Sequence, residues 1–184
     1  ADGAEQKGWN VGLGASISKN DLQEVMFELT PRAGYRINPR WELGGYLQII
    51  PHNYLSEYGH FGLGVFGEYT LLSKWGLRLF IDGKASANIG WGELIPSAEQ
   101  SYLNPTANYE TPHRLRSTYY EVGFIPGLAY RFPGSRMELK LRYMYAGFVD
   151  SGDWYKMAPG CHGSKSFIFD TGLRRFEFGL AYNF

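Results

Sequence analysis

The last nine residues of the chain, 176–184, read FEFGLAYNF. Apolar or aromatic side chains occupy every second position of this stretch: Phe176, Phe178, Leu180, Tyr182 and Phe184. The positions between them are acidic, small or polar. Successive side chains of a β-strand point to opposite faces of the sheet, so this alternation predicts a strand with one apolar face.

The same alternation recurs in seven earlier segments. We expect strands over Gly8–Ser18, Glu24–Ile37, Trp41–Ile50, Phe61–Leu71, Leu77–Ile89, Thr118–Tyr130 and Met137–Phe148, before a last strand over Leu173–Phe184. Strands of soluble proteins usually have about 5–6 residues, whereas a tilted strand needs about 9–11 to cross a bilayer. The longer segments here predict an all-β fold, an eight-stranded antiparallel up-and-down transmembrane β-barrel, with residues 1–184 as a single domain.

The connections alternate between short and long. The short ones are rich in turn-forming residues: Asn38–Arg40, Ser73–Lys74 and Phe132–Ser135. The long ones are Lys19–Gln23, Pro51–His60, Gly90–Ser117 and Val149–Gly172. Short turns at one end and long loops at the other are typical of outer-membrane barrels.

The composition agrees with a barrel and excludes several other classes. Aromatic residues make up 17% of the 184 residues, and the mean hydropathy is −0.30. No run of about 18 apolar residues is present, so a transmembrane helix is not expected. The net charge is zero and basic residues do not cluster, so no nucleic-acid partner is predicted. The start at Ala1, without an initiator Met, is interpreted as a mature end whose signal peptide has been removed.

Aromatic residues gather near the short-turn ends of the expected strands. Trp and Tyr concentrate at membrane–water interfaces, because one end of the side chain is apolar and the other forms hydrogen bonds. We therefore predict an aromatic girdle at one height of the barrel, formed by Trp9, Tyr35, Trp41, Tyr69, Trp75, Tyr130 and Tyr182.

The opposite faces of the strands carry charges of both signs. An eight-stranded barrel is only wide enough to be filled by its own side chains, and buried charges require partners. We expect a charge network that fills the lumen, formed by Glu42, Glu68, Arg78, Asp82, Lys84, Glu121, Glu138, Lys140, Arg142, Arg175 and Glu177. A narrow ion path through this network is the alternative interpretation.

The C-terminal strand resembles that of bacterial outer-membrane barrels, in which alternating apolar residues precede a terminal Phe. The whole pattern is similar to the small eight-stranded barrels, such as the OmpA transmembrane domain and the OmpX/Ail group, and to barrel domains of Bacteroidetes. This resemblance implies a place in the bacterial outer membrane, in contact with its lipid and lipopolysaccharide. It also implies that Phe176, Phe178, Leu180, Tyr182 and Phe184 form the signal read by the barrel-assembly machinery.

Evidence for enzymatic or metal chemistry is weak. The four histidines His52, His60, His113 and His162, and Cys161 beside the last of them, are interpreted as solvated loop residues, because their spacing matches no zinc motif. His162-Gly163-Ser164 resembles the His-x-Ser element of outer-membrane lipid A deacylases, but Lys165 stands where that family has Asn. We therefore expect no enzyme, no cofactor and no metal, and a lipid-modifying enzyme is the weakest alternative.

The long loops contain the remaining candidates. Aromatic side chains suit contact with proteins or glycans, and loops on a rigid scaffold are where function usually resides. The loop contact candidates are Trp91, Tyr102, Tyr109, Trp154 and Tyr155. The sequence thus predicts a structural or surface-interaction barrel whose loops bind a surface ligand, with transport of small solutes through a narrow pore as the alternative.

Overall fold

A computed structural model describes residues 7–19, 25–50, 59–94, 113–150, 165–171 and 176–184. These residues form ten strand segments: β1 (Gly8–Lys19), β2 (Val25–Arg36), β3 (Trp41–Ile50), β4 (Gly59–Lys74), β5 (Leu77–Leu94), β6 (His113–Arg131), β7 (Met137–Arg142), β8 (Tyr145–Asp150), β9 (Lys165–Asp170) and β10 (Glu177–Asn183). Among the described residues, no helix has the length and hydropathy needed to cross a membrane.

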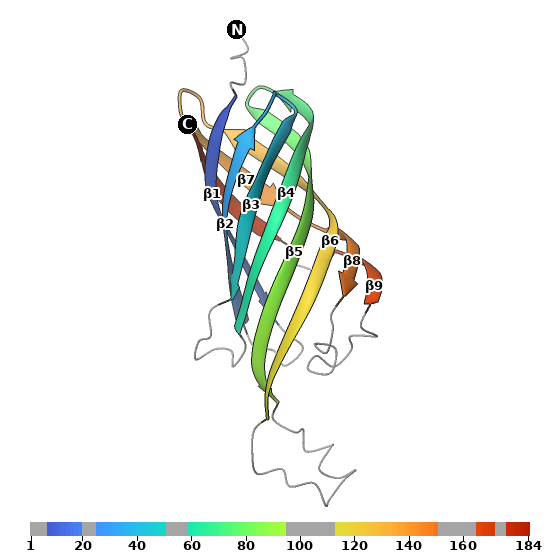
Figure 1. The fold of residues 1–184 in the computed structure, drawn as a ribbon. Helices are drawn as coiled ribbons and strands as arrows, with labels where there is room; N and C mark the ends of the chain where they lie inside the picture. Colours follow the sequence, from blue (N-terminus) through green and yellow to red (C-terminus); the bar gives the residue numbers. More distant parts are fainter. Residues whose placement is uncertain (1–6, 20–24, 51–58, 95–112, 151–164, 172–175) are drawn as a thin grey trace, which may run out of the picture.

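The ten segments build eight antiparallel barrel strands (Figure 1). β7 and β8 both pair with β6 and are separated only by Tyr143 and Met144, so they are two parts of one strand. β10 and β9 pair with β7 and β8 in turn and form the last strand. Pairing of β1 with β10 and of β5 with β6 closes the ring, which confirms the predicted fold class.

The short connections have the expected turn chemistry. Trp75 and Gly76 link β4 to β5 with φ of 55° and 80°, the positive values of a type I′ hairpin turn, whose twist matches that of its strands. The side chain of Asn38 accepts hydrogen bonds from the main-chain N–H groups of Arg40 and Trp41, each at 2.9 Å. β1 begins and β10 ends at this same end of the barrel, as Figure 1 shows.

The strands continue further into the predicted loops than the sequence indicated. The β5–β6 ladder runs to the pair Leu94↔His113, so the expected loop Gly90–Ser117 was too long and Trp91 lies on β5. β9 likewise lies inside the expected loop Val149–Gly172. Main-chain hydrogen bonds hold an antiparallel ladder together without apolar alternation, and the alternation of apolar residues therefore underestimates its length.

An extra residue in the seventh strand reverses the predicted orientation of its second half. Between the pairs Gly127↔Arg142 and Phe124↔Ala146, two residues of β6 lie opposite three residues of the seventh strand. Met144, at the interruption, has a φ of 71°. Such a bulge moves every later side chain to the other face. By regular alternation Tyr145 would share the outward face of Leu139 and Leu141, but it is fully buried in the interior.

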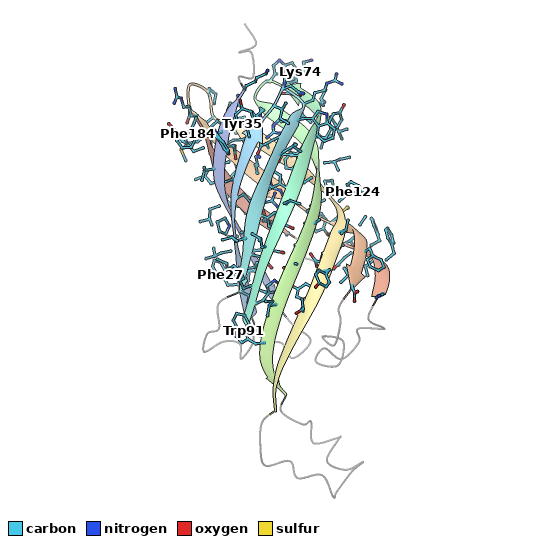
Figure 2. All side chains as sticks on the ribbon, in the orientation of Figure 1. Phe27, Tyr35, Lys74, Trp91, Phe124 and Phe184 are labelled. Atoms are coloured by element: carbon cyan, nitrogen blue, oxygen red, sulfur yellow. The ribbon has the colours of Figure 1, made fainter. Side chains whose placement is uncertain are left out.

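The barrel places apolar side chains outside and polar side chains inside. The outward set is exposed and includes Val11, Leu13, Leu43, Leu63, Val65, Leu79, Val122, Phe124, Leu128 and Leu180. Among the described residues, eighteen polar or charged ones are buried. Figure 2 shows Tyr35, Phe124 and Phe184 projecting from the barrel surface. The arrangement is that of a barrel surrounded by hydrocarbon, with its polar groups paired in the lumen.

Candidate functional site

The interior of the barrel at the short-turn end is filled by an ion-pair network. Five basic residues contribute to it, namely Arg32, Arg36, Arg78, Lys140 and Arg142, and so do five acidic ones, namely Glu42, Glu68, Asp82, Glu138 and Glu177. They come from β2, β3, β4, β5, β7 and β10, whose inward positions converge on the barrel axis. The network is balanced in formal charge, as burial in a low dielectric requires.

Glu68 is the centre of this network. Its carboxylate accepts hydrogen bonds from Lys140 Nζ at 3.0 Å and Arg142 Nη2 at 3.3 Å, and it forms a further, short ion pair with Arg78. Arg78 in turn donates Nη2 to both oxygens of Glu138, at 3.0 and 2.9 Å. A single carboxylate on β4 thus connects cationic side chains from β5 and β7 across the lumen.

Asp82 is a second centre, on the neighbouring strand β5. It accepts a hydrogen bond from Arg142 Nε at 2.9 Å and is also paired with Arg32 Nη1. Arg142 Nη1 donates to Glu177 at 2.9 Å, and this bond ties the network to β10. Because Arg142 contacts both centres through different nitrogens, its guanidinium holds the two halves of the network together.

Aromatic rings and glycines complete the filling. Phe80 is fully buried in the lumen, with the charged groups of Arg78, Lys140 and Arg142 at 5.3 to 5.8 Å from its ring centroid. A Cβ at Gly127 would meet this ring at 2.2 Å, so only glycine fits opposite Phe80. A cavity of about 10 Å³ remains beside the network, which is room for about one water molecule. The network therefore closes the lumen at this height.

The loop-end half of the interior is polar but carries fewer charges. His60 on β4 is 5% exposed; its Nε2 lies 3.2 Å from Asn88 Oδ1 and its Nδ1 lies 2.6 Å from Tyr119 Oη. Its interpretation as a solvated loop histidine is wrong, because β4 begins at Gly59 and the ladder draws His60 into the barrel. Lys84 and Glu121 form an ion pair at 3.0 Å, and Lys84 lies on the short-turn side of Asn88 along β5.

Eleven residues were predicted to form the charge network. Ten of the eleven lie in the interior, and Glu177 is the least buried of them. Arg175 lies outside the described residues. Arg32 and Arg36 belong to the same network, although they were not among the eleven predicted residues. Their inward parity on β2 was the available signal.

The aromatic residues predicted as a girdle all lie at the short-turn end. They pair across strands: Trp9 with Tyr35 at 5.4 Å between ring centroids, and Trp41 with Tyr69 at 4.8 Å. Trp75 is in the β4–β5 turn and is 83% exposed. Tyr130 contacts Phe132, and Tyr182 contacts Phe184.

A second aromatic ring, at the loop end, was missed by the sequence argument. Its members point outward: Phe27, Phe61, Trp91, Tyr120 and Phe148. Tyr35 and Phe27 are eight residues apart on β2, and eight residues cover roughly 27 Å along a strand. A tilt of about 40° reduces this to roughly 20 Å along the barrel axis, close to the apolar band of about 25 Å in membrane barrels.

The remaining predicted residues are those of the C-terminal assembly signal, the loop contact candidates, the histidines and Cys161. Phe178, Leu180 and Tyr182 project outward from β10, with Phe176 and Phe184 beside them. The residues outside the described ranges are Tyr102, Tyr109, Trp154, Tyr155, His52, Cys161 and His162. His113 begins β6. Over the described residues, no group of three or more His, Cys, Asp or Glu side chains is arranged to hold a metal ion.

An apolar exterior between two aromatic rings, around an ion-paired lumen, defines a class: the small eight-stranded β-barrels of membranes. The structure of Neisserial surface protein A (NspA) has this fold, with a TM-score of 0.57 and 14% identity over the full length of both chains. The N-terminal barrel domain of Pseudomonas aeruginosa OprF aligns with a TM-score of 0.47 and 16% identity, over 97% of this chain and all of that one. No protein-family model and no curated sequence matches the chain.

Proposed function

We propose that this protein is a non-enzymatic barrel of the bacterial outer membrane that presents a binding surface at its loop end and does not conduct solutes. The observation that carries the proposal is the balanced ion-pair network around Glu68 and Asp82, which leaves a cavity of about 10 Å³. A lumen filled in this way supports a scaffold role, in which the barrel holds a binding surface at its loop end.

The exterior supports the outer-membrane location. The outward side chains match the height and composition of a lipid-facing band, including both aromatic rings. The partners that follow are outer-membrane lipid and lipopolysaccharide around the barrel, and the barrel-assembly machinery, which would read the exposed alternation of Phe178, Leu180 and Tyr182 on β10.

The ribbon formed by β5 and β6 is the part best suited to hold a contact surface. It continues past the pair Gly90↔Ser117 to Leu94↔His113, beyond the level of the other strands (Figure 1). A ribbon that is paired as far as Leu94↔His113 is a rigid element, and sites on rigid elements lose less conformational entropy on binding.

The test uses variants that shorten the connections without touching the barrel. Because Leu94 and His113 are paired, an Asn-Gly turn in place of residues 95–112 closes the hairpin. A second variant replaces residues 151–164 with a short Gly/Ser linker. Binding of bacteria displaying each variant to a glycan array and to cultured epithelial cells is then compared with binding of bacteria displaying the parent.

We expect both shortened barrels to fold, as judged by heat-modifiable migration in gels, and to lose the adhesion of the parent. Planar-bilayer recordings of the parent should show no large stepwise conductance. If the shortened barrels keep full adhesion, the surface-interaction proposal is wrong. If the parent shows stepwise conductance, the ion-pair network does not close the lumen, and the function is that of a narrow pore.

A further inference from the structure

A pocket of about 140 Å³ lies at the short-turn end of the barrel, away from the loops. It is enclosed by the start of β1, the ends of β2 and β10, and the β6–β7 turn, with lining residues Gly8, Trp9, Arg36, Arg131, Ser135, Arg136, Asn183 and Phe184. Its volume is many times the roughly 10–15 Å³ that admits one water molecule. The pocket is thus large enough for a polyatomic ion.

The pocket is lined by three guanidinium groups and by no acidic side chain. Arg36 is 5% exposed and is paired with Glu42 at 3.1 Å. Arg131 and Arg136 differ, because neither forms an ion pair with any described residue of the chain. Arg131 lies opposite Glu138 in the β6–β7 ladder, yet Glu138 is paired with Arg78 and Arg36 instead. No acidic side chain of the described residues therefore neutralises the guanidinium groups of Arg131 and Arg136.

The pocket walls are held by main-chain hydrogen bonds. The N–H of Phe184 donates to Trp9 O at 2.9 Å, and the N–H of Asn183 donates to Arg136 O at 2.9 Å. Asn183 also accepts a side-chain hydrogen bond from Asn10 at 3.0 Å. The β6–β7 turn is consequently fastened to the seam between β1 and β10, and the arginine side chains project from a rigid frame.

We propose that this pocket is a binding site for a phosphate group, carried by a phospholipid headgroup or free in solution. Guanidinium groups donate paired hydrogen bonds that match phosphate oxygens, and Arg131 and Arg136 are the two that lack an internal partner. Ser135 and Asn183 add neutral polar groups. Trp9 and Phe184 are the aromatic residues of the lining, and we call them the apolar wall of the pocket. Both lie at the level of the aromatic girdle, where phospholipid phosphates lie.

The test measures lipid binding by native mass spectrometry of the protein released from detergent micelles. The probes are phosphatidylglycerol, which is anionic, and phosphatidylcholine, which has no net charge. We expect the parent to retain one phosphatidylglycerol, with at least tenfold preference over phosphatidylcholine. The variant R131Q/R136Q should lose this preference at least tenfold, whereas R131K/R136K should keep part of it.

Arg40→Gln is the matched control. Arg40 is exposed at the same end and contacts Tyr69 Oη at 3.3 Å, but it does not line the pocket. We expect R40Q to bind within twofold of the parent. All variants should fold, since none of the three side chains forms an ion pair with a described residue; heat-modifiable migration in gels checks this.

Competition with inorganic phosphate distinguishes the source of the group. Displacement of the lipid at millimolar phosphate supports a site for the phosphate group alone. Persistence of the lipid supports a headgroup site that also needs the apolar wall. Equal retention of both lipids by the parent would overturn the proposal, because the pocket would then not select the anionic headgroup. An equal loss in R40Q and R131Q/R136Q would overturn it as well, because the short-turn end would then act only through its total charge.

Discussion

The two halves of the barrel differ in the regularity of their strand pairing and in the charge of the interior. In the short-turn half every two neighbouring strands are hydrogen-bonded to each other, and ten charged side chains form ion pairs in the interior. In the loop-end half the seventh strand is interrupted at Tyr143 and Met144. The last pair between β1 and β10 is Ala15↔Phe178, and β9 pairs with β8 alone among the described residues. The interior there is mostly neutral, with His60, Asn88 and Tyr119 in contact.

The difference shows which part of the lumen requires a regular wall. Ion pairs in a low dielectric repay the loss of solvation only when their geometry is fixed. An extra residue in β7 would displace Lys140 or Arg142 by a full position and turn it toward lipid. Near the loop end the same insertion, at Met144, turned Tyr145 inward, where its buried ring fills space opposite Gly123. Neutral polar and aromatic side chains tolerate such a change far better.

The largest expected effect comes from breaking the centre of the network. Glu68→Gln leaves Arg78, Lys140 and Arg142 with one carboxylate fewer, and removal of one partner from a buried ion pair costs roughly 3–5 kcal/mol of unfolding free energy. Urea titration in lipid vesicles, followed by Trp fluorescence, measures it. Glu121→Gln in the loop-end half is the matched change and should cost clearly less. Equal losses would contradict the distinction between the halves.

The second effect concerns the lipid-facing surface. Leu180→Arg, halfway between the two aromatic rings, should lower the unfolding free energy by roughly 2–4 kcal/mol, whereas Tyr120→Arg, on the loop-end ring, should cost about 0–1 kcal/mol. The same titration in vesicles compares them. Leu180→Ala controls for lost apolar area. Should Leu180→Arg insert with unchanged stability, the outward parity of β10 would not correspond to contact with lipid.

A third effect tests the neutral half. His60→Ala removes the contacts of His60 with Asn88 and Tyr119, and the loss of these hydrogen bonds in the interior should cost about 1–3 kcal/mol. Tyr119→Phe removes only the phenolic contact and should cost less. The measurement is again unfolding by urea. A loss for His60→Ala that matches Glu68→Gln would mean that both halves depend equally on their polar groups.

The smallest effect is a gain in stability. Met144 has a φ of 71°, a conformation that costs L-residues roughly 1–2 kcal/mol and that Asn adopts more readily. Met144→Asn should therefore stabilise the barrel, by about 1 kcal/mol at most on that scale. Met144→Val, which introduces a β-branched side chain, should destabilise it. If both variants lose stability equally, Asn does not relieve the backbone strain at position 144, and Met144 contributes through the packing of its side chain.

Much of the barrel could be predicted from local pattern. The alternation from Phe176 to Phe184 and its seven repeats fixed the number of strands, their parity over most of their length and the short-turn end, because each property depends only on neighbours in sequence. The charged inward positions followed from the same parity. Asp82, for example, could be assigned to the interior without knowledge of its partners, because the prediction needed only its strand and its position in that strand.

Three features depended on the tertiary structure. The parity of Tyr145 depends on one unpaired residue at Met144, and its ladder with β6 reveals the shift. The length of β5 and β6 depends on main-chain pairing that continues past the apolar alternation, which moved Trp91 onto a strand. The start of β4 at Gly59 likewise moved His60 into the interior. The pocket around Arg131 and Arg136 joins β1, β2, β10 and the β6–β7 turn, which are distant in sequence. Local alternation encodes which face a side chain occupies, whereas register and closure arise only when separate strands meet and their hydrogen bonds must all be satisfied.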